Sequence, residues 1–277
     1  MKKLQLLLVI IFFSYCACKK EDITVSFSTA NQRFRESAEW NARNPFREIL
    51  VPSDDYSILC MGDSHVGSTK NLDAFFGISK SINASAVVMA GDLTSGNIND
   101  YAVFQQHIPN QDSLPSFVIV GNHDLYYDGW NEFYSKFGSS TYLFVIETPT
   151  ARDLFICLDS ASGTLGNEQI DWLKKVLQSK RSMYRHCLVF THNNFFLERH
   201  IESSAMSVDE LNVLIEIFTV HKVDLVIAGH DHNKAVESLG NTKYIVMDAL
   251  KDGLSNSGYL EINMKNNTLG YTFKNLQ

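Results

Sequence analysis

The stretch VDLVIAGHDHNK, residues 223–234, contains the transition on which the fold prediction depends. Its apolar run ends at Ala228, and Gly229 is then followed by His230 and His232, which stand one residue apart. A continuous apolar run is typical of a strand that is buried on both faces. Since alternate residues of an extended segment point to the same side, both imidazoles are expected to serve one site at the end of this strand.

Similar apolar runs recur along the chain and alternate with amphipathic stretches. The runs are YSILCM, AVVMA, SFVIV, LFICL and CLVFT. Between them, stretches such as residues 167–180 and 207–221 carry apolar residues at helical spacing behind plausible N-caps. This alternation predicts an α/β domain. After Lys243 the runs YIVM, GYLEINM and TLGYTF predict antiparallel strands that complete a second sheet.

Composition limits the possible partners. Of the 277 residues, 45% are hydrophobic, which is enough to fill the core of a globular domain. The formal net charge of -7 argues against a broad basic face for nucleic acid, although a small phosphate site stays compatible with it. Cys60, Cys157 and Cys187 each lie in a strand-like run, which predicts buried thiols and not a disulfide framework.

The first 18 residues are predicted to be a signal peptide. Lys2 and Lys3 precede an apolar stretch from Leu6 to Phe13 that is too short to span a bilayer stably. The segment resembles a bacterial lipoprotein signal in which Cys18 is lipidated. We therefore expect an exported chain that is lipid-anchored to a cell envelope membrane, facing the periplasm or the surface. Residues 19–52 are expected to form a tether and an N-terminal helix, and residues 53–277 one domain.

That N-terminal helix is predicted within NQRFRESAEWNARN, residues 31–44. Its apolar positions are Phe34, Ala38 and the segment from Trp40 to Ala42. They could form one face, by which the helix would pack on the outside of the core.

Polar side chains follow five of the apolar runs. They are Asp63 and His65, then Asp92, then Asn122, His123 and Asp124, then His192, and finally His230 and His232. Each alone is common turn chemistry, but five strand ends of this kind favour one site, because ligands bind at the carboxyl ends of strands in α/β sheets. Carboxylate, imidazole and carboxamide groups suit Mn, Fe or Zn, and a carboxylate offers two oxygens to bridge two ions.

The ordered set D-x-H, GD, GNHD, a later H and GH-x-H, over roughly Tyr56 to Ile262, resembles the calcineurin-like metallophosphoesterases. The resemblance implies a four-layer α/β/β/α sandwich that holds two divalent metal ions. It implies Asp63, His65 and His232 as ligands of one ion, Asn122, His192 and His230 as ligands of the other, and Asp92 as their bridge. It also implies that His123 contacts the scissile phosphate and can protonate the leaving oxygen, while Asp124 orients its ring.

Two departures from the family pattern concern the metal loops. The fourth loop reads HNN where many relatives have HHP, so Asn193 and Asn194 replace the residues after His192. Purple acid phosphatases carry a tyrosine ligand three residues after the bridging aspartate, and Ser95 stands there in this chain. We therefore expect no tyrosinate ligand and no purple ferric form.

The resemblance implies hydrolysis of a small phosphate ester by attack of metal-bound hydroxide, with a phosphodiester slightly favoured over a monoester. Two alternatives stay open: a phosphomonoesterase or nucleotidase, and a non-catalytic metal-binding scaffold of the same fold. Side chains near the motifs could contact substrate or simply pack; they are Tyr126, Tyr127, Trp130, Phe195, Phe196 and Arg199. We expect no nucleic-acid partner, and the sequence does not predict the oligomeric state.

Overall fold

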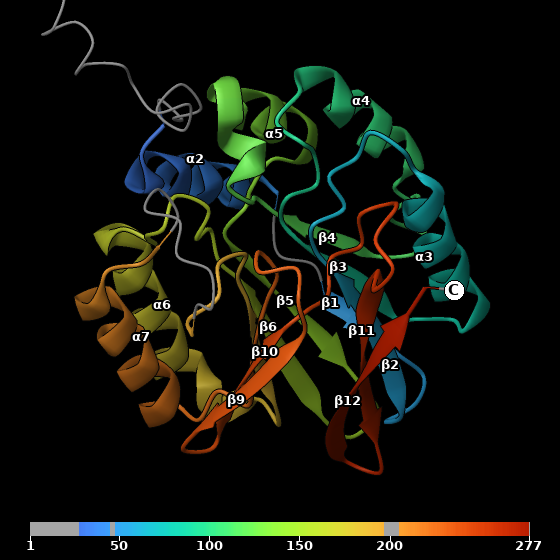
Figure 1. Cartoon of the computed structure of the whole chain (residues 1–277). Helices are drawn as coiled ribbons and strands as arrows, with labels where there is room; N and C mark the ends of the chain where they lie inside the picture. The colour runs from blue at the N-terminus through green and yellow to red at the C-terminus, as the bar shows by residue number, and fades with distance from the viewer. Residues whose placement is uncertain (1–27, 45–47, 197–204, 277) are drawn as a thin grey trace, which may run out of the picture.

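The computed structural model describes residues 28–44, 48–196 and 205–276. In this part of the chain two mixed sheets pack face to face, and helices cover their outer faces (Figure 1). This is the predicted four-layer α/β/β/α sandwich. The signal peptide, Cys18 and Arg199 lie outside the described residues. No described helix has the length and apolar character needed to cross a membrane.

The smaller sheet has the strand order β12-β11-β2-β3-β4. Its strands are β2 (Tyr56–Met61), β3 (Ala86–Ala90), β4 (Ser116–Ile119), β11 (Gly258–Lys265) and β12 (Thr268–Asn275). Strands β2, β3 and β4 run parallel, whereas β11 is antiparallel to β2 and to β12. The outer face is covered by α3 (Lys70–Ser81), α4 (Ile98–His107) and α5 (Trp130–Phe137).

The larger sheet has the strand order β1-β5-β6-β7-β8-β10-β9. Its strands are β1 (Glu48–Leu50), β5 (Tyr142–Glu147), β6 (Arg152–Cys157), β7 (Cys187–Phe190), β8 (Leu225–Ala228), β9 (Ala235–Leu239) and β10 (Thr242–Val246). Helices α6 (Asn167–Lys180) and α7 (Val208–Val220) cover its outer face (Figure 1). Helix α2 (Ala30–Arg43) packs beside α6, and the short 3-10 helices η2 (His123–Asp128) and η3 (Arg181–Met183) complete the elements.

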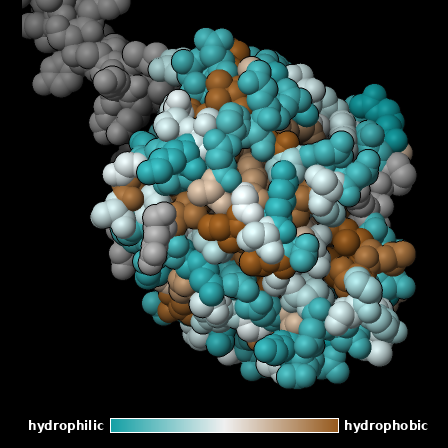
Figure 2. Space-filling model, turned by 90° about the vertical axis from the view of Figure 1, so that its right-hand side faces the viewer, coloured by the Kyte–Doolittle hydropathy of each residue, from teal (hydrophilic) through white to brown (hydrophobic). Residues whose placement is uncertain are grey.

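The core lies between the sheets and beneath the helices. A stack of three rings joins the sheets, since the centroid of Phe144 is 3.7 Å from that of Phe117 on β4 and 4.6 Å from that of Phe155 on β6. All five residues of β3 are buried, as expected of a strand enclosed on both faces. The three cysteines are buried free thiols, as predicted. On the face in Figure 2, hydrophilic and hydrophobic residues are interspersed.

The prediction for the run YIVM, residues 244–247, was wrong about the sheet that its strand joins. Strand β10 does not complete the second sheet in antiparallel fashion but runs parallel to β8 in the larger sheet. Its antiparallel partner is β9, which was not predicted because four of its five residues are exposed and form no apolar run. The predicted pair β11 and β12 is antiparallel, and it extends the smaller sheet.

Candidate metal centre

Predicted ligands from several strand ends meet at the carboxyl edges of the two sheets. Two groups of side chains could each hold a metal ion, because within each group the ligand atoms lie within 4.8 Å of one another. One group is Asp63, His65, Asp92 and His232, and the other is Asp92, His192 and His230. Asp92 belongs to both groups, so the loop after β3 stands between them.

In the first group, two imidazoles face each other. His65 Nε2 lies 3.2 Å from His232 Nε2, 3.6 Å from an oxygen of Asp92, and His232 Nε2 lies 3.4 Å from an oxygen of Asp63. When both rings are neutral, only one of the two facing Nε2 atoms can carry a hydrogen, because two would clash. At least one nitrogen lone pair therefore points into the group. These donors fit a cation.

In the second group, the amide of Asn122 adds a donor. Its Oδ1 lies 3.0 Å from His192 Nε2 and 2.9 Å from His230 Nδ1, and His192 Nε2 lies 3.3 Å from an oxygen of Asp92. His192 Nδ1 donates a hydrogen bond of 2.9 Å to the carbonyl of Ala90. This bond fixes the ring orientation and leaves Nε2 facing the group, as in many metal-binding histidines.

The backbone at these positions is held in an unusual conformation. Five of the predicted ligands have a positive φ: Asp63 (55°), His65 (41°), Asp92 (50°), His230 (73°) and His232 (63°). Non-glycine residues rarely adopt this region, and each such residue costs on the order of 1–3 kcal/mol. Their concentration in the site indicates that the surrounding fold imposes this geometry for function.

Glycines let the loops approach each other closely. A Cβ on Gly121 would lie 2.1 Å from the backbone nitrogen of Asp92, and a Cβ on Gly229 would lie 2.4 Å from an oxygen of Asp63. No side chain fits at either position without moving a predicted ligand.

Burial and charge together set the protonation of the site. Burial lowers the pKa of His65 and of His230 to about 4, so both rings are neutral at pH 7, which is the form that binds metals. Burial also disfavours a charged His192, but the charge of Asp92 outweighs it and raises the His192 pKa to about 10. The same attraction holds the pKa of Asp92 below its usual range despite its burial. A positive charge is thus favoured beside Asp92.

His123 lies at the accessible side of the site. Its side chain is 35% exposed, and its Nε2 lies 3.9 Å from an oxygen of Asp92. The ring sits against His65 and Tyr126, with centroid distances of 4.6 and 4.5 Å. Burial lowers the pKa of His123 from its usual value. This position leaves the ring open to a ligand that binds over the predicted metal loops.

Asp124 does not take the expected position. Its buried carboxylate accepts hydrogen bonds from the backbone nitrogens of Leu93, Thr94 and Gly121 and from the hydroxyl of Thr94, at 2.9–3.1 Å. Both oxygens are used in this way, and neither hydrogen-bonds to the ring of His123. Burial and the charge of Asp92 raise its pKa to about 7. Asp124 therefore ties the loop after β3 to the loop after β4.

The aromatic candidates for substrate contact divide into two kinds. Trp130 and Phe195 are buried, so they are packing residues. Tyr127 and Phe196 are exposed. The hydroxyl of Tyr126 accepts a hydrogen bond of 3.4 Å from Nδ2 of Asn122. Tyr126 therefore contacts two predicted site residues, Asn122 and His123.

Sequence reasoning missed the residues that support the fourth and fifth loops. Asn194 Nδ2 donates to Asp231 at 2.9 Å and so links the loop of His192 to the loop of His230. The hydroxyl of Ser160 accepts from the backbone nitrogens of His192 and Asn193, at 3.0 and 2.9 Å. The HNN sequence was noted only as a departure, and Ser160 had no motif to mark it.

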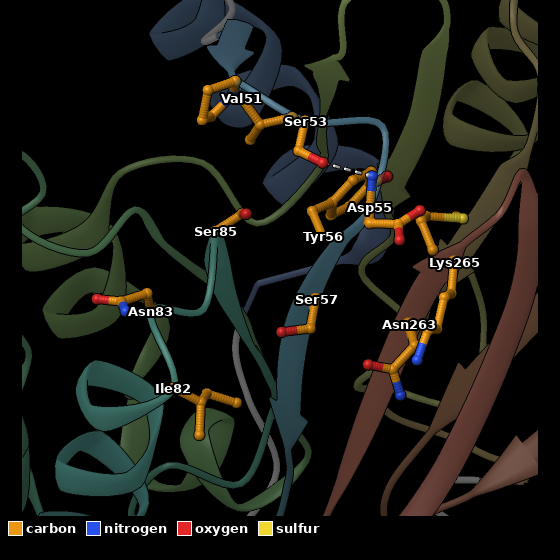
Figure 3. Close-up of a pocket in the computed structure, with 12 residues that line it drawn as sticks. Val51, Ser53, Asp55, Tyr56, Ser57, Ile82, Asn83, Ser85, Asn263 and Lys265 are labelled. Carbon is orange, nitrogen blue, oxygen red and sulfur yellow. Dashed lines mark hydrogen bonds between the residues drawn. The ribbon is translucent and has the colours of Figure 1, made fainter.

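A cavity of about 370 Å³, lined by both polar and apolar residues, lies away from this site (Figure 3). Its lining includes Tyr56 and Ser57 at the start of β2, and Ser85 just before β3. The predicted ligands follow the opposite ends of the same strands. The cavity is therefore not part of the candidate metal centre.

Comparisons with solved structures support the fold. A dimetal phosphatase from Danio rerio aligns with a TM-score of 0.61 at 12% identity, over 79% of this chain and 96% of that one. GAP50, described as the anchor in the inner membrane complex of Plasmodium, aligns with a TM-score of 0.60 at 15% identity, over 79% and 84%. A putative 5′-nucleotidase from Staphylococcus aureus, in complex with alpha-ketoglutarate, aligns with a TM-score of 0.54 at 12% identity, over 80% and 53%.

The family is shown by the sequence itself. No curated protein sequence gives a significant match. The family described as calcineurin-like phosphoesterase matches residues 56–234, which is more than half of the chain and spans every predicted ligand. The chain therefore belongs to the calcineurin-like phosphoesterase family, which makes it a metal-dependent hydrolase of phosphoric esters.

Proposed function

We propose that the chain hydrolyses a small phosphate ester with two divalent metal ions held side by side. The observation that carries this proposal is the position of Asp92, whose carboxylate belongs to both potential metal-binding groups. Its two oxygens face different groups, since one lies 3.3 Å from His192 Nε2 and the other 3.6 Å from His65 Nε2. A carboxylate in this position suits a bridge between two ions.

The other ligands divide around this bridge. Asp63, His65 and His232 would hold one ion, and Asn122, His192 and His230 would hold the other. When bound, the ions would supply the positive charge that neutralises the phosphate and acidifies an attacking water molecule. The donor set lacks thiolates and is compatible with Mn, Fe or Zn.

His123 is the candidate proton donor. Its lowered pKa favours the neutral ring at pH 7, and a neutral imidazole still carries one N–H that can donate to a phosphate oxygen. Its partly exposed position beside Asp92 supports this role, because an ester bound over the metal loops would be within reach of the ring. We propose that this N–H orients the phosphate, and that the negative charge of the bound phosphate favours the imidazolium, which is the form that can give a proton to the leaving oxygen. Asp124 acts indirectly, by fixing the loop on which His123 sits.

A phosphodiester is our first candidate substrate and a monoester the second. The solved structure described as a putative 5′-nucleotidase shares the fold, and it gives a reason to test nucleoside monophosphates beside diesters. The structure described as an anchor, GAP50, gives a reason to test the non-catalytic scaffold as well.

The deciding experiment uses the domain stripped with a chelator and reloaded separately with Mn²⁺, Fe²⁺ or Zn²⁺. Hydrolysis of bis-p-nitrophenyl phosphate is compared with that of p-nitrophenyl phosphate, and Asp92→Asn is the control. Metal-dependent turnover that Asp92→Asn abolishes supports the proposal, and the better substrate identifies the ester class. Two bound ions without turnover of these esters or of nucleoside monophosphates would favour the scaffold.

Export and lipid anchoring at Cys18 remain a proposal from the sequence. Labelling of cells that express the full chain with a radioactive fatty acid tests it. Label should be incorporated by the wild-type chain and lost in Cys18→Ser, whereas equal labelling of both would contradict the anchor.

A further inference from the structure

The most deeply buried side of helix α2 is largely polar. Its buried residues are Ala30, Arg33 and Ser37, whereas a surface helix normally buries an apolar stripe. The apolar face expected from the sequence was correct only in part, because Phe34 contacts Trp172 and Trp40 lies against Gly138, whereas Ala38 is exposed. The helix also lies outside the matched region of the family, residues 56–234. A buried polar face needs specific partners, because unpaired polar groups are costly in a protein interior.

Arg33 reaches the loop that follows β6. Its side chain is fully buried, and it donates to both oxygens of Asp159, at 2.7 and 3.1 Å. The same guanidinium donates to the hydroxyl of Ser162 and to the carbonyl of Ser28, both at 2.8 Å. This two-pronged pairing fixes both the distance and the orientation of the Asp159 loop.

The residue after Asp159 continues this chain of contacts to a predicted ligand. The hydroxyl of Ser160 accepts hydrogen bonds from the backbone nitrogens of His192 and Asn193. Ser160 is itself fully buried, so water does not compete for these bonds. A shift of the Asp159 loop would therefore move the backbone that carries the imidazole of His192.

Ser37 lies one helical turn after Arg33, on the same face, and leads to a second loop. Its hydroxyl accepts from the backbone nitrogen of Ser140 at 3.2 Å. The hydroxyl of Ser140 in turn accepts from the backbone nitrogen of Val120 at 2.9 Å. Val120 stands two residues before Asn122, so this second chain ends at the loop of another predicted ligand.

We propose that α2 is a structural support of the metal centre and that Arg33 and Ser37 are positioning residues for His192 and Asn122. In the proposed function both ligands bind the same ion, together with His230. The inference rests on the proposed function for this division of the ligands between two ions. Hydrogen bonds are directional, so they hold the two loops at a defined separation in a way that an apolar contact would not. The inference predicts that damage to this face weakens one ion selectively.

The test is a Mn²⁺ titration of the metal-stripped domain that includes α2, followed by calorimetry. His65→Ala and Asn122→Ala serve as markers, because each should remove the binding step of a different ion. Arg33→Lys keeps the buried charge but loses the planar fork that matches the carboxylate. We expect it to weaken the step marked by Asn122→Ala by roughly 10- to 100-fold, as for other residues that orient metal ligands. The step marked by His65→Ala should change less than about 3-fold.

Matched controls separate positioning from general stability. Arg35→Lys alters an exposed arginine of the same helix, which pairs with Glu168, and should leave both steps unchanged. Ser37→Ala removes one hydroxyl and no charge, so it serves if Arg33→Lys does not fold, and it should weaken the same step by several-fold. Circular dichroism establishes that each variant is folded.

Three results would overturn the inference. They are unchanged Mn²⁺ binding in folded Arg33→Lys and Ser37→Ala, equal weakening of both steps, and a wild-type domain that binds a single ion. Failure of the proposed hydrolysis is distinguishable from these results. A wild-type domain that binds two ions but hydrolyses no ester would refute the proposed hydrolysis and leave the effect of Arg33 on metal binding measurable.

Discussion

Gly121→Ala is expected to disable the site through one displaced ligand. Gly121 precedes Asn122, and its φ is not among the positive values, so its backbone conformation is open to alanine. The added methyl group would lie 2.1 Å from the backbone nitrogen of Asp92 and 2.3 Å from its Oδ1. Because Cβ atoms essentially never approach within 3.0 Å of such atoms, the two loops must separate by about 0.9 Å.

This separation acts on the carboxylate proposed to serve both ions. A misplacement of about 1 Å in a catalytic group can cost about 100-fold in rate, so we expect kcat/KM for the better p-nitrophenyl ester to fall by about two orders of magnitude. Overpacking in a tight interior also costs roughly 1–3 kcal/mol of unfolding free energy, so the domain should remain folded at 25 °C. Initial rates at saturating metal and urea unfolding measure the two effects.

Gly67→Ala is the matched control. Gly67 lies in the loop after β2, close in sequence to Asp63 and His65, but a Cβ there would meet no atom within 4 Å. It should keep kcat/KM within about 3-fold of the wild type. A Gly121→Ala variant as active as Gly67→Ala, with the same metal requirement, would refute the argument that Asp92 must stay where the structure places it.

The remaining predictions concern stability and the surroundings of His123. Burial lowers the pKa of His65 and of His230 to about 4, below the usual 6.5. Between these pH values the unfolded chain therefore binds more protons than the folded one. The unfolding free energy of the metal-free domain should fall as pH drops from 6.5 to 4. His192, whose pKa is raised to about 10, affects stability in the opposite direction, because its contribution to the unfolding free energy is present below pH 6.5 and is lost as pH rises toward 10. Urea unfolding from pH 4 to 10 should therefore show a maximum of the unfolding free energy near pH 6.5. This maximum should shift in His230→Ala or His192→Ala. Arg33→Met leaves the buried Asp159 without its partner and should lower the unfolding free energy by about 3–5 kcal/mol. Arg35→Met removes an ion pair whose side chains are 59% and 39% exposed, and should lower it by less than about 1 kcal/mol. Equal urea midpoints of the two variants would contradict this. Tyr126→Phe keeps the ring against His123 and removes the hydroxyl, which accepts a 3.4 Å hydrogen bond from Asn122, so kcat/KM should fall less than about 5-fold. Tyr126→Ala also removes the ring and should lose clearly more in the same rate assay.

The candidate site was largely predictable because its signals are local. Each group of ligands directly follows a run whose apolar character shows that it is a buried strand, and parallel strands bring their carboxyl ends to one edge. The structure accordingly brings Asp63, His65, Asp92, His192, His230 and His232 together, with Asn122 among them. Their roles as ligands remain a prediction, as does the role of His123.

The errors concern partners that lie far away in the sequence. Asp124 was expected to orient its neighbour His123, but residues about 30 positions earlier, Leu93 and Thr94, take up its carboxylate. Strand β10 was assigned to the wrong sheet, since an apolar run does not specify its neighbours. For Trp130 the sequence left packing and substrate contact open, and the fold decides for packing, with the indole donating to Glu36 on α2.

By itself, the sequence determined the α/β class, the positions of the buried strands and the residue types at the strand ends, because strand burial and turn chemistry are encoded in short stretches. Only the tertiary structure decided which strands are neighbours and which face of α2 is buried. These depend on contacts such as Arg33 with Asp159, 126 residues apart, which no local pattern encodes. Tertiary packing also holds five predicted ligands at positive φ, a conformation that their local sequence disfavours.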